Sequence, residues 1–550
     1  MTTDARARAN RGKDTASKAT EFDALIVGAG FSGLYQLHAL RDRLGLSAQV
    51  LEAAEGVGGT WYWNRYPGAR CDSESHSYCF SFSEDLVNEW EWSERYPAQP
   101  EVMRYLDFVA DRLDLKRDIR FQTKVVAAEY DEARNRWQVA TEAGERLAAT
   151  YLITAVGCLS AANIPDIPSL DRFEGDWYHT GLWPHEDVDF SGKRVIQIGT
   201  GSTGIQAAPV IAEAAAHLTV LQRTPNYSVP AQNAPLTDEF RRQVKETFAE
   251  IRRTMRSTPN GHAFTIADRS VFDVTPEERE AIYEAAWAKG GLQFRASFRD
   301  VLLSKEANDT AAEFVKKKIR EIVKDPTTAE QLANIDHPYA GKRPPIDTNY
   351  FETFNRDNVA LVDVRTDPIA EITSTGVRLQ SGAEHAADII VFATGFDAMT
   401  GTLLRMGIRR RDGLTLEQAW DGGPRNYLGL QVPGFPNMFT ITGPGSPSVL
   451  CNMPVPIEQH VEWISDCIAH LRQHGIERIE AQPEATDEWV EQVNEAARAT
   501  LLSEVDHSWY VGANVPGKPR VFMPYAGGMT RYRAICDEVA VNGYSGFVLD

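Results

Sequence analysis

Short apolar runs alternate with helical patterns in two separate parts of the chain. In the first part, apolar residues dominate positions 22–27, leucines at helical spacing follow from residue 34 to residue 40, and a second apolar run at 48–51 ends in Glu52. The same order of strand, helix and strand returns at residues 193–198, 205–216 and 218–223. Strands that alternate with helices in this way predict parallel βαβ units. We therefore expect an α/β fold with two Rossmann-type, doubly wound domains.

The pattern changes twice after these units. Residues 236–335 are charged and amphipathic with no strand-like run, and Thr275 and Pro276, with Glu278 three residues after the threonine, have the composition of a capped helix start. Apolar strand patterns return at 359–364 and 388–393. We predict a helical insertion within the second domain. The predicted segments are a disordered tail at 1–20, a discontinuous first domain at 21–160 and 385–550, a second domain at 161–235 and 336–384, and the insertion at 236–335.

A glycine-rich turn stands between strand and helix in both units. The first turn is Gly28-Ala29-Gly30-Phe31-Ser32-Gly33, and the second is Gly199-Thr200-Gly201-Ser202-Thr203-Gly204. Glycines allow the tight turn and the close approach of a pyrophosphate to free N–H groups at the start of the helix. A lone G-x-G-x-x-G is a weak signal, but each copy here follows a strand and opens a helix. Two such turns predict two bound nucleotides.

The residue after each second strand distinguishes the two nucleotides. A carboxylate at Glu52 would accept hydrogen bonds from ribose hydroxyls, which suits FAD or NAD. The second unit ends in Gln222-Arg223-Thr224 with no acid, and a guanidinium beside a hydroxyl suits the 2′-phosphate of NADPH. A solvated surface charge is the alternative interpretation of Arg223. An FAD site followed by an NADPH site predicts a flavoprotein that takes up hydride and passes its electrons onward.

The cysteines limit which acceptor can receive those electrons. The six cysteines are scattered and form no Cys-x-x-Cys pair, so we expect no redox dithiol, no iron–sulfur cluster and no metal site. Molecular oxygen or a small organic acceptor is left. Unpaired thiols also suit a reducing compartment, which predicts a cytoplasmic protein.

Charge and hydropathy exclude several partners. The formal net charge is −20, which argues against a nucleic acid or an anionic membrane surface as partner. No run of about 18 apolar residues is present, so we expect no transmembrane helix. The first twenty residues also lack the apolar stretch of roughly 7–15 residues that a secretory signal needs. The oligomeric state has no clear signal in the sequence, and we expect a monomer.

One pattern before the second glycine turn is highly specific. Residues 173–184 fit F-x-G-x-x-x-H-x-x-x-W-P, in which the fixed positions are Phe173, Gly175, His179, Trp183 and Pro184. This pattern resembles the fingerprint of the single-component, FAD-containing (type I) Baeyer–Villiger monooxygenases. Further matches to that family are found at residues 59–72, 341–344, 393–397 and 508–518. The resemblance spans nearly the whole chain after the tail, and looks closest to the phenylacetone, steroid and cyclopentanone-type enzymes.

The resemblance implies a reaction. In such enzymes NADPH reduces FAD, oxygen adds to give a C4a-peroxyflavin, and this oxidant converts a ketone to an ester or lactone. The expected substrate is a small cyclic, aryl or steroid-like ketone together with O2. An N- or S-oxygenase of amines or sulfides is the main alternative, and a non-catalytic nucleotide-sensing flavoprotein is a third. The fingerprint with its tryptophan, and a pair formed by Asp72 and Arg343, favour the ketone oxygenase.

The resemblance also implies roles for residues. Arg343 matches the catalytic arginine, which stabilises developing negative charge, and Asp72 matches the carboxylate that orients it; the alternative is a purely structural ion pair. His179 is expected to couple domain motion, and Trp509 to lie on a mobile loop that meets NADP and substrate. The predicted substrate-pocket residues, for which ordinary core packing is the alternative, are Ser448, Val449, Leu450 and Met453. The predicted cofactor-binding residues are Gly28, Gly30, Phe31, Ser32, Gly33, Glu52, Gly59, Thr60, Trp61, Tyr66, Asp72, Gly199, Gly201, Ser202, Thr203, Gly204, Arg223, Thr224, Lys342, Gly395 and Trp509.

Overall fold

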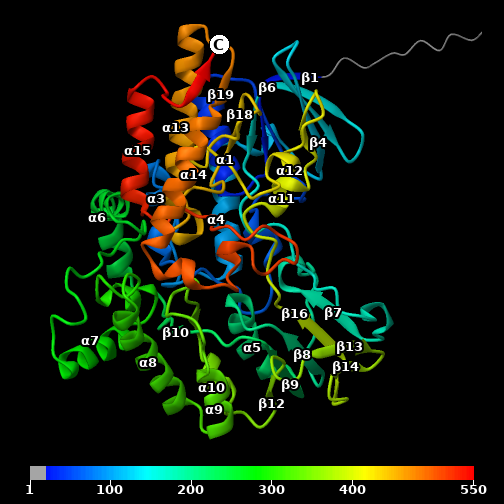
Figure 1. Cartoon of the computed structure of the whole chain (residues 1–550), viewed down its shortest axis with the longest axis vertical. Helices are drawn as coiled ribbons and strands as arrows, with labels where there is room; N and C mark the ends of the chain where they lie inside the picture. Colours follow the sequence, from blue (N-terminus) through cyan, green and yellow to red (C-terminus); the bar gives the residue numbers. More distant parts are fainter. Residues whose placement is uncertain (1–19) are drawn as a thin grey trace, which may run out of the picture.

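Two sheets rich in parallel strands organise the protein, one above the other in the view of Figure 1. The structure is a computed structural model, and it describes residues 20–550. The predicted tail at 1–20 lies outside the described residues except for Thr20, which begins the first strand. The predicted α/β class is confirmed as a mixed α/β fold with parallel sheets.

The upper sheet is built around the first predicted βαβ unit. Its strand order is β17-β4-β5-β6-β1-β2-β3, and β18 also pairs with β6. Strand β1 runs parallel to both β2 and β6, and its residues 24–26 are fully buried, since parallel strands are covered on both faces. The strands are β1 (Thr20–Val27), β2 (Ala48–Leu51), β3 (Ile119–Arg120), β4 (Val125–Asp131), β5 (Arg136–Thr141), β6 (Arg146–Thr154), β17 (Ile408–Arg410) and β18 (Met438–Thr440).

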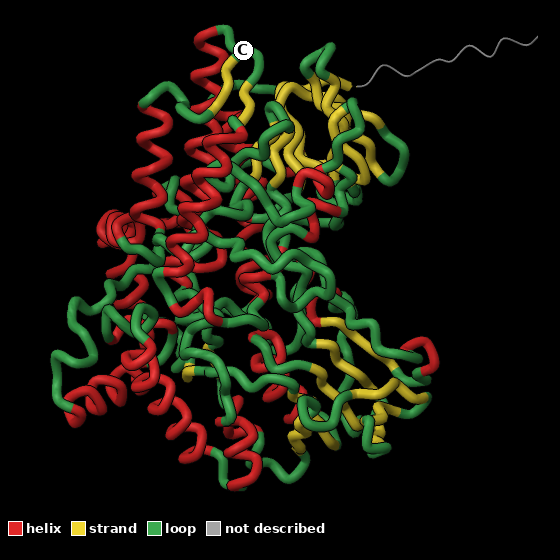
Figure 2. Tube along the Cα trace, in the orientation of Figure 1, coloured by secondary structure: helices red, strands yellow, loops and turns green. Residues whose placement is uncertain are grey.

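Helices far apart in the sequence cover this sheet. Helix α1 (Phe31–His38) packs against α13 (Pro454–His474), where Gln36 Nε2 donates a hydrogen bond of 3.1 Å to Ser465 Oγ. Both helices contribute to one apolar core with α4 (Gln99–Arg112) and α15 (Met529–Val541). Figure 2 shows these long helices beside the strands of the upper sheet. The other elements of this half are α2 (Thr60–Trp63), α3 (Glu84–Glu89), α11 (Gly401–Leu404), α12 (Leu416–Ala419), α14 (Pro483–Arg498), β19 (Ile479–Ala481) and β20 (Phe547–Leu549).

The lower sheet contains the second predicted unit. Its order is β12-β9-β8-β16-β7, with every pair parallel. Helix α5 (Ser202–Ala214) connects β8 to β9. The strands are β7 (Asp176–His179), β8 (Arg194–Ile198), β9 (His217–Gln222), β12 (Val359–Asp363) and β16 (Ile389–Phe392), and beside them lies an antiparallel sheet of β13 (Ile369–Thr373), β14 (Gly376–Leu379) and β15 (Glu384–Ala386).

The position of β16 corrects one predicted boundary. The boundary at residue 385 assigned residues 389–392 to the first domain, but β16 pairs with β7 and β8 in the lower sheet. An apolar strand fits the middle of either parallel sheet, so its hydrophobic pattern alone could not decide between them. The chain therefore leaves the lower sheet only after residue 392.

The segment 236–335 is helical, as its pattern predicts, and holds no strand. Its helices follow the left side of the molecule from mid-height down to its lower end in Figure 1. Helix α7 begins with a complete capping box, in which Thr275 Oγ1 accepts from Glu278 N and Glu278 Oε2 accepts from Thr275 N. The helices are α6 (Asp238–Ser257), α7 (Pro276–Lys289), α8 (Lys305–Ile322) and α9 (Pro326–Ala333). Two short elements lie between this segment and β12: β11 (Ile346–Asp347), which pairs with β10 (Val229–Pro230), and α10 (Tyr350–Thr353).

Two linkers, which lie side by side, connect the upper sheet to the lower sheet. One leaves β6 after residue 154 and the other leaves β16 after residue 392. Asn163 N donates to Gly395 O at 3.0 Å, and Thr394 Oγ1 donates to Asn163 O at 2.7 Å. From residue 20 onward, no helix is both long and apolar enough to cross a membrane.

Candidate active site

A cavity of about 1250 Å³ lies where strands of both sheets end. Val27 and Leu51, the last residues of β1 and β2, line it, as do Ile198 and Leu221 at the ends of β8 and β9. The carboxyl ends of parallel strands are the usual place for ligands in open α/β sheets. All the predicted cofactor-binding residues except Gly33 and Gly204 line this cavity. The structure thus brings together side chains from five distant parts of the sequence.

The first glycine turn forms a cradle that side chains would fill. Gly28 has a φ of +105°, and a Cβ there would lie 2.6 Å from Ala155 O. A Cβ at Gly33 would lie only 1.8 Å from Gly28 O, so this glycine serves the packing of α1 on the turn. Gly30 and Gly59 face each other so closely that a Cβ at Gly59 would be 3.0 Å from Gly30 Cα. The bare backbone at the start of α1 fits a pyrophosphate.

Glu52 closes the first turn from the other side. Its Oε2 accepts from Ala29 N at 2.6 Å and its Oε1 from Ala54 N at 2.8 Å. Burial raises the pKa of this carboxyl above its usual value, although these backbone hydrogen bonds oppose the rise. Each carboxylate oxygen has a second lone pair, so both can still accept from a ligand. The prediction that Glu52 binds ribose hydroxyls fits this geometry and stays a prediction.

The second glycine turn repeats the cradle on the lower sheet. Gly199 has a φ of +112°, and a Cβ there would lie 2.4 Å from Ala393 O. A Cβ at Gly204 would lie 2.4 Å from Gly199 O, which makes Gly204 the packing glycine of α5. A Cβ at Gly201 would meet nothing within 4 Å, because this residue borders the open cavity. Both turns therefore have the shape that a dinucleotide requires.

Two cations and a threonine border the cavity beyond the second turn. Arg223 and Thr224 follow β9, and Lys342 comes from the segment after α9. Thr224 is held by its carbonyl, which accepts from Thr200 Oγ1 at 2.9 Å. Burial and the neighbouring Arg223 lower the pKa of Lys342 to about 8, against the opposing effect of Asp336. Within residues 20–550 neither cation forms a salt bridge, so both charges are available to an anionic ligand.

Arg343 and Asp72 form a bidentate pair in the same cavity. Arg343 Nε donates to Asp72 Oδ2 at 2.5 Å, and Nη2 donates to Asp72 Oδ1 at 2.9 Å. Nη1 donates to two backbone carbonyls, Val449 O at 2.9 Å and Cys451 O at 3.3 Å. A guanidinium has five N–H donors, so these four bonds leave one N–H of Nη2 free. The fixed arginine can therefore donate one more hydrogen bond to a reacting group.

The pair remains charged. Burial is the largest single effect and opposes the charged form of both groups, but the partner's charge and hydrogen bonds together outweigh it: Arg343 lowers the pKa of the Asp72 carboxyl, and Asp72 raises the pKa of Arg343. His262, which is buried beside the pair, has its pKa lowered to about 3 by burial and by Arg343. The imidazole is therefore neutral near pH 7. The site presents one fixed cation, already oriented by its carboxylate.

Aromatic residues line the region between the two turns. Trp61 on α2 donates from Nε1 to Tyr78 Oη at 3.1 Å. Tyr66 donates from its hydroxyl to Gln206 Oε1 at 2.8 Å, which ties the first half of the chain to α5. Trp509 also borders the cavity, from a loop near the C-terminus. These positions suit the predicted contacts with flavin and NADP, which stay predictions.

The predicted substrate-pocket residues divide into two groups. Val449 and Met453 line the cavity, and Val449 also holds Arg343 through its carbonyl. Ser448 and Leu450 are not among the lining residues; Ser448 is fully buried. These residues form a short 3₁₀ helix, in which three successive side chains point in three different directions. The structure therefore brings only half of this set to the site.

The fingerprint residues lie outside the cavity, at the edge of the lower sheet. His179 ends β7, is almost fully buried, and accepts from Gly181 N through Nδ1 at 3.0 Å. Its other side faces the backbone of Asn163 and Gly395, the two linkers between the sheets, and burial lowers its pKa. Gly175 is packed tightly, since a Cβ there would lie 2.4 Å from Asp388 O. Phe173 and Trp183 belong to two different apolar clusters, and Pro184 is half-buried.

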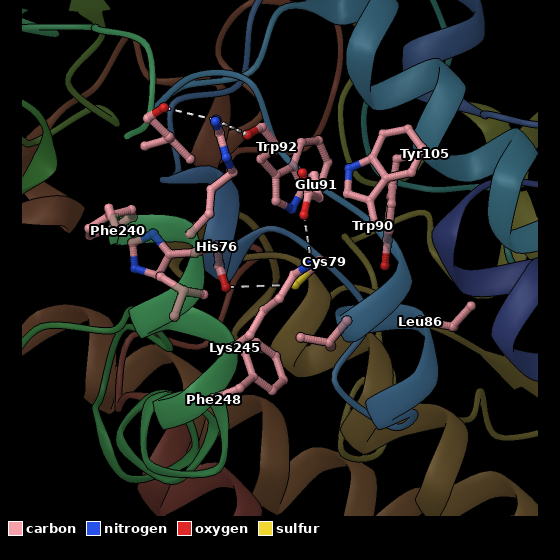
Figure 3. Close-up of a pocket in the computed structure, with 14 residues that line it drawn as sticks. His76, Cys79, Leu86, Trp90, Glu91, Trp92, Tyr105, Phe240, Lys245 and Phe248 are labelled. Carbon is pink, nitrogen blue, oxygen red and sulfur yellow. Dashed lines mark hydrogen bonds and ion pairs between the residues drawn. The ribbon is translucent and has the colours of Figure 1, made fainter. Parts of the chain in front are cut away.

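A smaller hollow lies between α3, α4 and α6 (Figure 3). Its volume is about 40 Å³, room for one or two water molecules only. Most of its lining is aromatic or aliphatic, and its charged groups are satisfied: Lys245 Nζ pairs with Glu91 Oε1 at 3.0 Å. It has neither the size nor the free polar groups of an active site.

Comparison with known proteins decides the family. A model for flavin-binding monooxygenase-like proteins matches residues 23–230. A Baeyer–Villiger monooxygenase from Pseudooceanicola batsensis is 44% identical over 541 residues, which covers 98% of both chains. The chain belongs to the Baeyer–Villiger monooxygenases. The family predicted from the fingerprint and its companion motifs is thus confirmed.

This Baeyer–Villiger monooxygenase is also similar to solved structures over nearly its whole length. An oxidized steroid monooxygenase bound to NADP is 50% identical, has a TM-score of 0.91, and matches over 96% of this chain and 99% of that one. OTEMO in complex with FAD and NADP is 42% identical, with a TM-score of 0.93 over 97% of this chain and 100% of the other. These complexes agree with the two predicted cofactors. A phenazine N-monooxygenase from Lysobacter antibioticus is also 42% identical, over 96% of this chain and 97% of that one.

Several residues of the Baeyer–Villiger monooxygenase site were missed by sequence reasoning. Cys158, Gln206 and His507 line the large cavity, and His262 lies beside the Arg343–Asp72 pair. None of them stands at a fixed position of a glycine turn or of the fingerprint. Gln206 carried a usable signal, because it lies one turn beyond the second glycine turn on the same helix. The others are brought to the site only by long-range folding.

Proposed function

We propose that this enzyme oxidises ketones to esters or lactones, with NADPH and O2 as co-substrates and FAD as its resident cofactor. The observation that carries the proposal is the bidentate Arg343–Asp72 pair, which lies in the same cavity as the two glycine turns. Two dinucleotide cradles bring a hydride donor and a flavin together. A fixed cation between them serves a reaction that develops negative charge.

We assign one nucleotide to each of the two main sheets, as in two doubly wound domains. The FAD-binding domain comprises residues 21–160 together with about 394–550, and the NADPH-binding domain comprises 161–235 together with 336–393, with the helical insertion between them. The glycine cradles, Glu52 on the upper sheet and Arg223 on the lower sheet support this assignment. When bound, FAD supplies hydride acceptance from NADPH and the activation of O2.

The chain's own contribution is a fixed charge in a partly dry site. The side chains of Arg343 and Asp72 are only 21% and 29% exposed. Arg343 cannot lose its proton near neutral pH, and its free N–H can bond to the substrate carbonyl oxygen as negative charge develops there. Asp72 holds the guanidinium in place, so little reorganisation is needed during the reaction. Val449 and Met453 offer apolar surface for the ketone's carbon groups.

Oxygenation of a soft nitrogen or sulfur is the second candidate. The relative named a phenazine N-monooxygenase supports it, because its identity to this chain is similar to that of the Baeyer–Villiger relative. Attack on an amine or sulfide does not build a carbonyl oxyanion, so Arg343 would be less needed for that step. The requirement for Arg343 therefore separates the two activities.

The direct test uses purified enzyme, NADPH and a panel of cyclic, aryl and steroid-like ketones, with amines and sulfides alongside. We expect one ester or lactone per NADPH consumed for at least one ketone. Oxidation of an amine or sulfide with no ester from any ketone would select the second candidate. NADPH consumption yielding only hydrogen peroxide with every compound would contradict both.

Arg223→Ala tests the assignment of NADPH to the lower sheet. We expect KM for NADPH to rise about 10- to 100-fold, because a charge-assisted hydrogen bond to the phosphate is lost, with little change in KM for NADH. Steady-state kinetics with both nucleotides measure this difference. Equal changes for NADPH and NADH would remove Arg223 from the phosphate site.

Three further expectations stay proposals. The enzyme is expected to act as a monomer, to lie in the cytoplasm and to bind no nucleic acid. The net charge of −20 supports the last of these.

A further inference from the structure

A histidine outside every sequence motif lies at the proposed phosphate site. His507 lines the same cavity as Arg223, Thr224 and Lys342. It belongs to residues 505–518, called here the C-terminal loop, which also carries Trp509. His507 is far from both glycine turns in the sequence, so it reaches the cavity only through the folding of this loop.

The C-terminal loop is packed directly on the turn that carries Lys342. A Cβ at Gly341 would lie 2.7 Å from Val505 Cγ2, so glycine is needed for this close approach. The loop is ordered by its own backbone bonds: Ser508 N donates to Val505 O at 3.0 Å. His507 is therefore held beside Lys342 by packing on both sides.

The imidazole of His507 has an incomplete set of partners. Its Nε2 lies 3.7 Å from Asp336 Oδ1, too far for a hydrogen bond. That nitrogen is buried without a hydrogen-bond partner among residues 20–550, whereas the side chain as a whole is 37% exposed and borders the cavity. Asp336 also lies 3.3 Å from Arg365 Nη1, which shares its charge. The imidazole therefore borders the cavity beside two cations that form no salt bridge among residues 20–550, an arrangement that can hold an anionic ligand.

Burial and the surrounding charges favour the neutral form of this imidazole. Burial lowers the pKa of His507, and Lys342 and Arg223 lower it further, against the opposing effects of Asp336 and Asp506. The neighbouring His337, whose ring centroid lies 5.7 Å away, has its pKa lowered to about 4 by burial and by Lys342. His337 therefore stays neutral over the physiological range, and His507 is the histidine that can change charge.

We infer that His507 is a further ligand of the 2′-phosphate of NADPH, and that it takes up a proton from solvent when the phosphate binds. The inference rests on the proposed NADPH site. The two negative charges of a phosphate dianion offset the positive charges of Lys342 and Arg223, which otherwise lower the pKa of His507. The protonated imidazole can then donate a charge-assisted hydrogen bond to the phosphate. Because Trp509 follows two residues later, this bond would also hold the C-terminal loop over the cavity.

The proton uptake fixes the sign of the pH dependence. The pKa of His507 is higher in the nucleotide complex than in the free enzyme. The extra binding is therefore fully present below the free-enzyme pKa, and is lost as pH rises through the pKa of the complex. NAD, which has no 2′-phosphate, should show no such change. Discrimination between NADP and NAD should consequently fall as pH rises.

The test is calorimetric titration of NADP⁺ and NAD⁺ into the FAD-loaded enzyme in two buffers of different ionisation enthalpy. The parent enzyme and His507→Asn are compared directly, and the same comparison in a Lys342→Arg background identifies any proton uptake that belongs to Lys342, whose pKa is about 8. We expect His507→Asn to weaken NADP⁺ binding about tenfold at pH ~7, to abolish the proton uptake, and to leave NAD⁺ binding unchanged. At a pH above the His507 pKa of the complex, the NADP⁺ difference should largely vanish. The phosphate's own ionisation is common to both proteins and cancels in the comparison.

Two controls keep the outcomes separate. His385→Asn on β15, which does not line the cavity, should change neither nucleotide. Equal weakening of NADP⁺ and NAD⁺, unchanged proton uptake, or no change in either nucleotide would overturn the role of His507. If Arg223→Ala abolishes the NADP⁺ preference while His507→Asn has no effect, only this inference fails. If the parent enzyme shows no preference for NADP⁺ over NAD⁺, the proposed cofactor site fails as well.

Discussion

Replacement of Arg343 by alanine should abolish ester formation while leaving FAD bound and NADPH still consumed. The guanidinium makes four hydrogen bonds that fix it in the cavity and keeps one N–H for the substrate. Loss of one preorganised oxyanion donor costs about 10²–10³ in rate, and the loss here includes the charge itself. Product analysis by gas chromatography, with flavin absorbance as the measure of bound FAD, gives both results.

The matched control for this prediction is Arg409→Ala. Arg409 on β17 also pairs with an acid, Glu129, at 2.8 Å, but on the surface. We expect its removal to change ester formation by less than about twofold, since exposed ion pairs contribute little. Arg343→Lys should recover only a small part of the activity, because an ammonium cannot bind Asp72 in bidentate fashion. Ester formation at the parent rate in Arg343→Ala would refute the assigned role.

Gly33→Ala should have the second large effect, the loss of bound FAD. A Cβ at this position would lie 1.8 Å from Gly28 O, and that oxygen is backbone of the first glycine turn. Either the turn or the start of α1 must move, and the N–H groups that would hold a pyrophosphate move with it. Purified Gly33→Ala protein should therefore be colourless or insoluble. Absorbance near the flavin band per mole of protein measures the effect.

Gly422→Ala is the corresponding control. A Cβ there would meet nothing within 4 Å, so the variant should be as yellow and as stable as the parent. If Gly33→Ala bound FAD with the parent stoichiometry, the turn could not be the tight cradle described above. If both variants lost FAD, the effect would reflect general fragility and not the turn.

Local patterns predicted much of the secondary structure because the relevant signals are local. The strands at 22–27, 193–198 and 359–364, the two glycine turns and the capped start of α7 all depend on residues within a few positions of one another. The membership of β16 could not be predicted in the same way. Its buried apolar residues fit either parallel sheet, and only pairing with β7 and β8 decides.

The site was predictable only where it coincides with motifs. Asp72 and Arg343 are 271 positions apart, and no local pattern joins them; family resemblance supplied that pair. Ser448 and Leu450 were assigned to the pocket by the same route, yet the short helix that contains them directs only Val449 to the cavity. His507 carries no motif at all. It is brought to the phosphate site by the packing of Val505 on Gly341.

The central claim is that this chain inserts one oxygen atom from O2 beside a ketone carbonyl. The most direct measurement is a turnover with NADPH, a ketone that proves to be a substrate and ¹⁸O2 in unlabelled water, read by mass spectrometry of the product. We predict an ester or lactone that carries one ¹⁸O atom, and no label when ¹⁶O2 and H2¹⁸O are used after correction for carbonyl exchange. An ester whose new oxygen comes from water, or an unchanged ketone while an amine or sulfide gains the label, would contradict the claim.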